Sequence, residues 1–121
     1  MSDYSYSHKE KMKDLDMQKA QQELKASILS AIAHPNRIRI LEFLKNGIKC
    51  NCEIAPALNL EQSNLSRHMK ILVQGGIVVS WKDGLRVNYK IADESIFEIL
   101  DAAGNVARNA AKEKIKILEE A

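Results

Sequence analysis

The hydrophobic period of the chain changes at Gly75-Gly76, and this change constrains the fold more than any other feature of the sequence. In the preceding stretch, "EQSNLSRHMKILVQ", apolar residues recur at the spacing of one helical face. In the stretch "IVVSWKDGLRVNYKI" that follows, apolar and polar residues alternate around an Asp-Gly turn signal. The sequence therefore predicts a helix over Gln62–Gln74 and then a two-stranded β-hairpin.

The face of this helix opposite its apolar residues is polar and basic, with Ser63, Arg67, Lys70 and Gln74 on it. The segment 62–90 carries five Lys or Arg and one acid, whereas 93–121 carries seven acids and four bases. The whole chain has a net charge of only +2. Because positive charge is concentrated in one segment, that segment is expected to face phosphates.

The other elements are predicted to be helices. Apolar spacing favours one helix over 13–33 and a second from Pro35 to a stop at Gly47, and a short helix then ends near Asn59, which tolerates a left-handed turn. A last helix of about 25 residues begins near Asp93 and carries a narrow apolar stripe rich in small residues. Since a small core cannot cover that stripe, we expect it to pair with a second copy of the chain.

Length and composition indicate how many domains the chain forms and in which compartment it is expected. The 121 residues are 45% hydrophobic, enough for one core, and the polar residues 1–12 are expected to form a flexible arm before a single domain at 13–121. No apolar stretch has the length of a membrane span or a leader. Two cysteines one residue apart are no secreted disulfide framework. We therefore expect a cytoplasmic protein with available thiols and no membrane partner.

Four motifs in order resemble one known family. They are "AIAHPNRIRILEFL", "CNCEIAPAL", "EQSNLSRHMKILVQGGIV" and "KDGLRVNYKI", and they resemble the ArsR/SmtB family of dimeric, effector-responsive transcriptional repressors. The resemblance implies a mainly α, dimeric winged helix-turn-helix with a β-hairpin. It assigns 53–60 as the positioning helix, 62–74 as the recognition helix and 77–91 as the wing. The first and last helices would form a homodimer.

A recognition helix enters the major groove of double-stranded operator DNA, where short polar side chains and arginine read base edges. The candidates in its first turns are Gln62, Ser63, Asn64, Ser66 and Arg67. Arg67 suits guanine, and Gln62 or Asn64 suits adenine. Lys82 and Arg86 flank the wing tip and are expected at phosphates or in the minor groove, while Lys70 is expected at the backbone. His68, near the apolar face, is expected to be a packing residue. The alternative is that these side chains are merely solvated.

Cys50 and Cys52 lie at the start of the short helix, where a helix N-terminus lowers a thiol pKa. Thiolates are soft ligands for As(III), Cd and Zn. The run "CNCEI" matches the Cys-x-Cys-acid-aliphatic pattern of metalloid sensors in the resembled family. The resemblance thus implies a repressor released by a thiophilic metal or metalloid that serves as effector and is not needed for folding.

Two thiols do not complete a three- or four-ligand site, so a third donor is needed. The candidates are His8, Glu53, a small thiol or solvent. The zinc site that some family members hold between their last helices is not expected, since 93–121 contains no histidine. Two alternatives use the same cysteines: a strained, easily reduced disulfide that senses redox state, or small apolar side chains with no sensory role.

Other functions remain open from the sequence. A winged helix also serves as a protein-interaction module, in which the basic face would bind an acidic protein surface. No motif of an enzyme occurs, since paired carboxylates, a nucleophile elbow and a phosphate-binding glycine loop are all missing from the sequence.

Overall fold

The computed structural model describes residues 7–120. Its elements are α1 (His8–Ile32), α2 (Pro35–Leu44), β1 (Lys49–Cys50), α3 (Asn51–Leu58), α4 (Gln62–Gln74), β2 (Val78–Asp83), β3 (Arg86–Ile91) and α5 (Ile96–Glu120). Helices thus dominate, with one small antiparallel sheet. The predicted class, mainly α with a winged helix-turn-helix, is confirmed.

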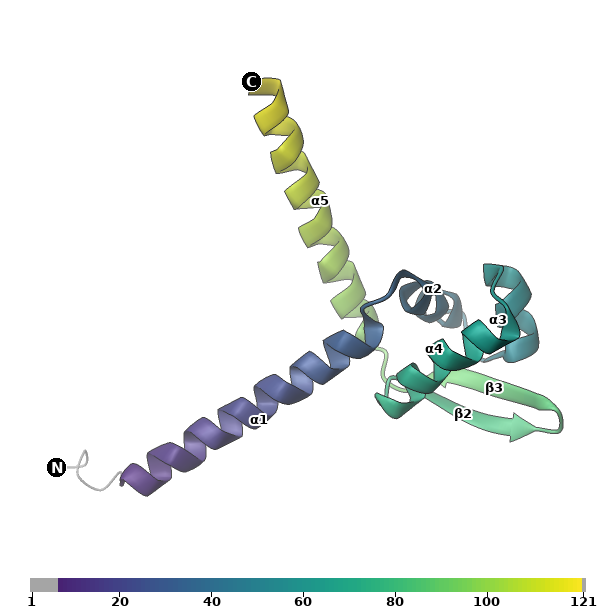
Figure 1. The fold of residues 1–121 in the computed structure, drawn as a ribbon, viewed down its shortest axis with the longest axis horizontal. Coiled ribbons are helices and arrows are strands. Elements are labelled where there is room, and N and C mark those ends of the chain that lie inside the picture. Colours follow the sequence, from purple (N-terminus) through teal and green to yellow (C-terminus); the bar gives the residue numbers. More distant parts are fainter. Residues whose placement is uncertain (1–6, 121) are drawn as a thin grey trace.

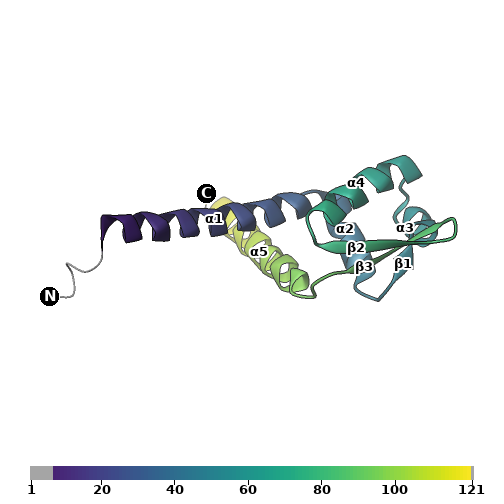
Figure 2. The same cartoon turned by 90° about the horizontal axis from the view of Figure 1, so that it is seen from below.

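The body of the molecule consists of α2, α3, α4 and the sheet, and α1 and α5 extend away from it in two directions (Figures 1 and 2). Its core is built from aliphatic side chains that these elements share. The largest fully buried ones are Ile40, Leu41, Leu44, Ile54, Leu65, Met69, Leu72 and Val78. Because α4 contributes three of these residues, its back is fixed to the core and its opposite face is left to solvent.

The turn between α3 and α4 follows from one residue. Asn59 adopts the left-handed conformation, with φ of 55°, and ends α3 as its C-cap. The predicted bounds of α4 agree with the structure at both ends, whereas α3 starts at Asn51, two residues before the expected Glu53. At the end of α4, Gly75 allows a close approach of α1, because a Cβ there would lie 3.0 Å from the Cβ of Ala31.

The sheet has three strands in the order β1-β3-β2, not the two of the predicted hairpin. The hairpin itself is confirmed: β2 and β3 pair antiparallel from Val78↔Ile91 to Asp83↔Arg86, and Gly84 at the turn has φ of 64°. The third strand, β1, pairs Lys49 with Tyr89 and Cys50 with Asn88. A strand of two residues is too short to show an alternating pattern in the sequence. It is a strand only because it pairs with β3.

Helix α1 begins earlier than expected. Ser7 caps it, because its side chain accepts a hydrogen bond from the Glu10 N–H at 3.2 Å while the Glu10 carboxylate accepts one from the Ser7 N–H at 3.2 Å. The helix therefore starts at His8 and not at Lys13, and 8–12 is helical. The rest of the arm predicted at 1–12, apart from Ser7, lies outside the described residues. No helix in 7–120 combines the length and apolarity needed to cross a membrane.

Candidate DNA interface and cysteine site

The predicted recognition face of α4 is available to a ligand. Arg67 and Ser63 are exposed, as are Gln62, Ser66 and Lys70, and Asn64 is half-buried. Arg67 donates a hydrogen bond from Nη2 to Oδ1 of Asn64 at 3.4 Å, one helical turn earlier. This long, exposed contact holds the guanidinium along the helix and is easily exchanged for a base edge. The structure thus brings the six predicted α4 residues onto one helix with its back in the core.

The wing carries the other predicted contacts. Lys82 in β2 and Arg86 in β3 are both exposed and stand on either side of the turn, where Asp83 pairs with Arg86. Figure 2 shows the hairpin extending beside α4, so that the recognition helix and the wing belong to one side of the body. An elongated polyanion can therefore contact both elements.

His68, on the core side of α4, is buried beside two other basic side chains, His34 and Arg37. Its ring is 8% exposed and lies 4.5 Å, centroid to centroid, from the ring of His34. Arg37 Nη1 lies 3.3 Å from His68 Nδ1, and because a guanidinium only donates, Nδ1 accepts and the proton of the neutral ring is on Nε2. Burial lowers the pKa of His68, and its basic neighbours His34, Arg37 and Arg67 lower it further. The expected packing role is confirmed, with a neutral ring.

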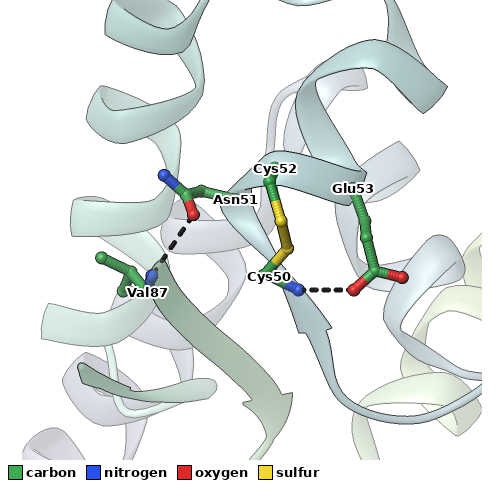
Figure 3. Close-up of a disulfide and its surroundings, with 5 residues drawn as sticks. All are labelled: Cys50, Asn51, Cys52, Glu53 and Val87. Carbon is green, nitrogen blue, oxygen red and sulfur yellow. Dashed lines mark hydrogen bonds between the residues drawn. A yellow bond between two sulfur atoms is a disulfide. The ribbon is translucent and has the colours of Figure 1, made fainter. Parts of the chain in front are cut away.

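The two cysteines are joined in the structure. A disulfide links Cys50 and Cys52, whose Cα atoms are 5.2 Å apart (Figure 3). Cys50 is the N-cap of α3 and is 3% exposed, whereas Cys52 lies in the first turn of α3 and is exposed. Only one of the two cysteines, Cys50, is therefore buried in the core. Solutes reach the pair from the Cys52 side.

Of the candidate third ligands, Glu53 lies beside the cysteines and His8 does not. The Glu53 carboxylate already accepts a hydrogen bond at Oε1 from the Cys50 N–H, at 3.1 Å, and so caps α3 (Figure 3). His8 is the first residue of a helix about 37 Å long, and that end of α1 lies across the molecule from α3 (Figure 1). Within one chain the structure thus brings Glu53, but not His8, to the cysteines.

The two sulfurs are bonded to each other, so the structure holds a disulfide and not the available thiols that the sequence predicts. Reduction of this bond would free two neighbouring sulfur donors. Among residues 7–120, however, no group of three or more His, Cys, Asp or Glu side chains could hold a metal ion. A tetrahedral Zn or Cd site, which takes four ligands, is therefore not formed by the described part of one chain.

Sequence reasoning missed Asn51, the residue between the cysteines. Its Oδ1 accepts a hydrogen bond from the Val87 N–H in β3 at 3.2 Å (Figure 3). No periodicity or motif links residues 36 positions apart, and only the pairing of β1 with β3 brings them together. The one available signal was the polar Asn between two thiols at a helix start.

The comparisons with known proteins match the same elements. Residues 34–80 match the model of the family described as "Bacterial regulatory protein, arsR family". The HTH-type transcriptional regulator Rv0081 of Mycobacterium tuberculosis is 36% identical over 98 residues, which are 80% of this chain and 86% of that protein. The crystal structure of Rv0081 superposes with a TM-score of 0.68 at 34% identity, covering 78% of this chain and 96% of that one.

Two further relatives bear on assembly and effector. The homodimeric winged helix-turn-helix domain of Mb0332 from Mycobacterium bovis, solved by NMR, has a TM-score of 0.69 at 26% identity and covers 81% of this chain and 91% of that one. The arsenical resistance operon repressor of Staphylococcus xylosus is 33% identical over 69 residues, 57% of this chain and 66% of that protein. Sequence, fold and exposed helix face agree, and the chain belongs to the ArsR family of winged-helix, DNA-binding transcriptional regulators.

Proposed function

We propose that this protein is a homodimeric transcriptional repressor that leaves its operator when the chemical state of Cys50 and Cys52 changes. One observation carries the proposal: both sulfurs meet at the N-terminus of α3, the helix that immediately precedes the recognition helix α4. A change at this point is connected through the short turn at Asn59 to the residues that would read DNA. A sensory role requires such a connection between two sites.

DNA is the ligand that the surface favours. The exposed side chains of α4 offer donors and acceptors of the kind that read major-groove base edges, with Arg67 as the guanine reader. Lys70 would contact the phosphate backbone, and Lys82 and Arg86 would do so from the wing or enter the minor groove. The protein-interaction alternative is disfavoured because the relatives are named as transcriptional regulators.

A homodimer would cover apolar surface that one chain leaves in water. Large apolar side chains are exposed along both projecting helices: Met12, Leu15, Met17, Leu24 and Leu29 on α1, and Val106, Ile115, Ile117 and Leu118 on α5. Large exposed apolar patches commonly mark sites of protein–protein contact. The homodimeric Mb0332 domain supports the same arrangement. Two copies of α4 would then enter successive major grooves on one side of a pseudo-palindromic site.

The dithiol and disulfide forms provide one switch. In the presence of a low-molecular-weight disulfide, the Cys52 thiolate attacks it and releases one thiolate. Cys50 then attacks the mixed disulfide and releases the second. The small disulfide is thereby reduced to two thiols, and the two cysteines are oxidised with loss of two protons and two electrons. The exposure of Cys52 and the burial of Cys50 favour this order of attack.

Arsenite binding to the reduced pair is a second candidate, supported by the arsenical resistance operon repressor among the relatives. Each thiol would displace one hydroxyl of arsenous acid, so that two As–S bonds form and two waters leave. The third position on arsenic keeps its hydroxyl or takes a small thiol. Two protein sulfurs are enough for this chemistry, whereas Zn and Cd would need donors beyond the described residues of one chain.

Titration of the reduced protein on its own upstream DNA tests both switches. Arsenite, cadmium, zinc and a low-molecular-weight disulfide are added separately while fluorescence anisotropy follows DNA release. Release by arsenite or by the disulfide, lost in Cys50→Ser and in Cys52→Ser, supports the proposal. Release that persists in both variants would place the sensor elsewhere. Ala92→Ser, an equally small change at an exposed position between β3 and α5, serves as the matched variant that keeps both thiols.

A further inference from the structure

The cysteine pair is attached to the wing as well as to α3. Cys50 is the last residue of β1 and pairs with Asn88 of β3, while it also caps α3. Cys52 belongs to α3 alone. The bond between their sulfurs therefore spans the junction where a strand of the wing sheet becomes a helix of the helix-turn-helix (Figure 3).

Asn51 sits at that junction and extends the pairing of β1. The backbone of β1 pairs Lys49 with Tyr89 and Cys50 with Asn88, and the next position in this register would join Asn51 to Val87. The backbone has already turned into α3 at Asn51, and its side chain accepts the Val87 N–H in place of a backbone carbonyl, at 3.2 Å. This bond is partly buried and continues the ladder to the residue beside Arg86.

We propose that Asn51 is the positioning residue that transmits the state of the cysteine pair to the wing, and through Val87 to the DNA contact of Arg86. The inference rests on the proposed function and adds a structural connection between the cysteine pair and the DNA contact of the wing. Forming or opening the sulfur bridge changes the backbone on both sides of Asn51. Because the Asn51 side chain is short, it cannot compensate for a backbone shift, so that Val87 either moves with Asn51 or loses its hydrogen-bond acceptor. The wing, and not α4 alone, then changes its position relative to DNA.

The chain contains a reporter of this movement. Trp81, its one tryptophan, lies in β2 opposite Asn88, which pairs on its other side with Cys50. Cys50, Asn88 and Trp81 thus form one row across the three strands. The indole is 40% exposed, so that its emission responds to small changes in solvent contact.

The experiment compares full-length parent, Asn51→Ala and Asn51→Asp, each as dithiol and as disulfide. An aspartate oxygen accepts the same N–H, whereas alanine offers no acceptor. In the parent, Trp81 emission without DNA and affinity for operator DNA should both differ between the two forms. Asn51→Asp should keep both differences. Asn51→Ala should lose the emission difference and reduce the affinity ratio of the two forms by about fivefold, the usual weight of one hydrogen bond.

The outcomes separate the inference from the proposed function. If the parent binds DNA equally well in both forms, the proposed redox switch fails. The Trp81 emission of the parent and of Asn51→Ala then tests by itself whether Asn51 connects the cysteine pair to the wing. If Asn51→Ala shows the emission and affinity differences of the parent, the route through Asn51 is wrong. An emission difference caused by direct sulfur quenching would also persist in Asn51→Ala and would count against the inference.

A second measurement needs no variant. Amide hydrogen exchange at Val87 in the parent should be slower in the form that keeps the Asn51 hydrogen bond, with the amides of the core helices as the internal control. Equal exchange at Val87 together with equal Trp81 emission in the dithiol and disulfide forms would overturn the inference even if Asn51→Ala did not fold, because Val87 would then neither move nor lose its acceptor.

Discussion

Removing the two wing cations should change how DNA binding depends on salt. Lys82 and Arg86 are exposed on either side of the hairpin turn, so the double variant Lys82→Ala/Arg86→Ala leaves the core intact. In a dimer the variant removes four cations. If each neutralises one phosphate, the slope of log affinity against log salt becomes less steep by about 3.6. Over a fourfold rise in salt, the variant should therefore lose about 150-fold less affinity than the parent.

Fluorescence anisotropy with operator DNA at about 50 to 200 mM salt measures this slope directly. The matched control is Lys13→Ala/Lys19→Ala, which removes the same charge from exposed positions on α1, away from the wing in Figure 1. The control should keep the parental slope. Equal slopes for the wing variant and the control would refute the placement of the wing on DNA, because only net charge would then matter.

Three further changes test other parts of the account. Arg67→Ala should lower operator affinity by about 1–3 kcal/mol but leave binding to scrambled DNA nearly unchanged, as parallel titrations on both duplexes would show. Burial and the basic side chains beside His68 lower its pKa below the ordinary value, so the unfolded chain binds its proton first. The contribution of His68 to the free energy of unfolding is complete above the ordinary pKa of about 6.5 and is lost as pH falls through the lowered value. In urea unfolding, the free energy of unfolding of His68→Gln should therefore change less with pH than that of the parent. Val106→Glu on α5 should yield monomers in sedimentation equilibrium, while Asn105→Glu, which lies about 100° away around the same helix, should not.

Much of the fold could be predicted because α4 and the hairpin have strong, opposite periods. On the predicted apolar face of α4, Leu65, Met69 and Leu72 are buried and Val73 is half-buried, and the bounds of this helix agree with the prediction. Asn59 ends α3 as expected, because few residues other than glycine adopt a left-handed conformation cheaply. The start of α1 was missed because a capping box between Ser7 and Glu10 extends the helix into a polar stretch without apolar spacing.

The site was only partly predictable, for a physical reason. The exposed face of α4 follows from helical geometry, and the adjacency of the two sulfurs follows from their spacing. The strand β1 and the Asn51–Val87 hydrogen bond depend on a partner far along the chain. Local propensity carries no information about such a contact, so the link between the cysteines and the wing emerged only from the structure.

The central claim is that the chemical state of Cys50 and Cys52 sets the affinity for DNA. The most direct measurement follows one protein sample on operator DNA by anisotropy as it is taken from disulfide to dithiol, then treated with arsenite, and then returned to dithiol with excess small dithiol. Tight binding is expected in both dithiol stages, and release is expected in the disulfide and arsenite stages. The same affinity at all four stages would contradict it.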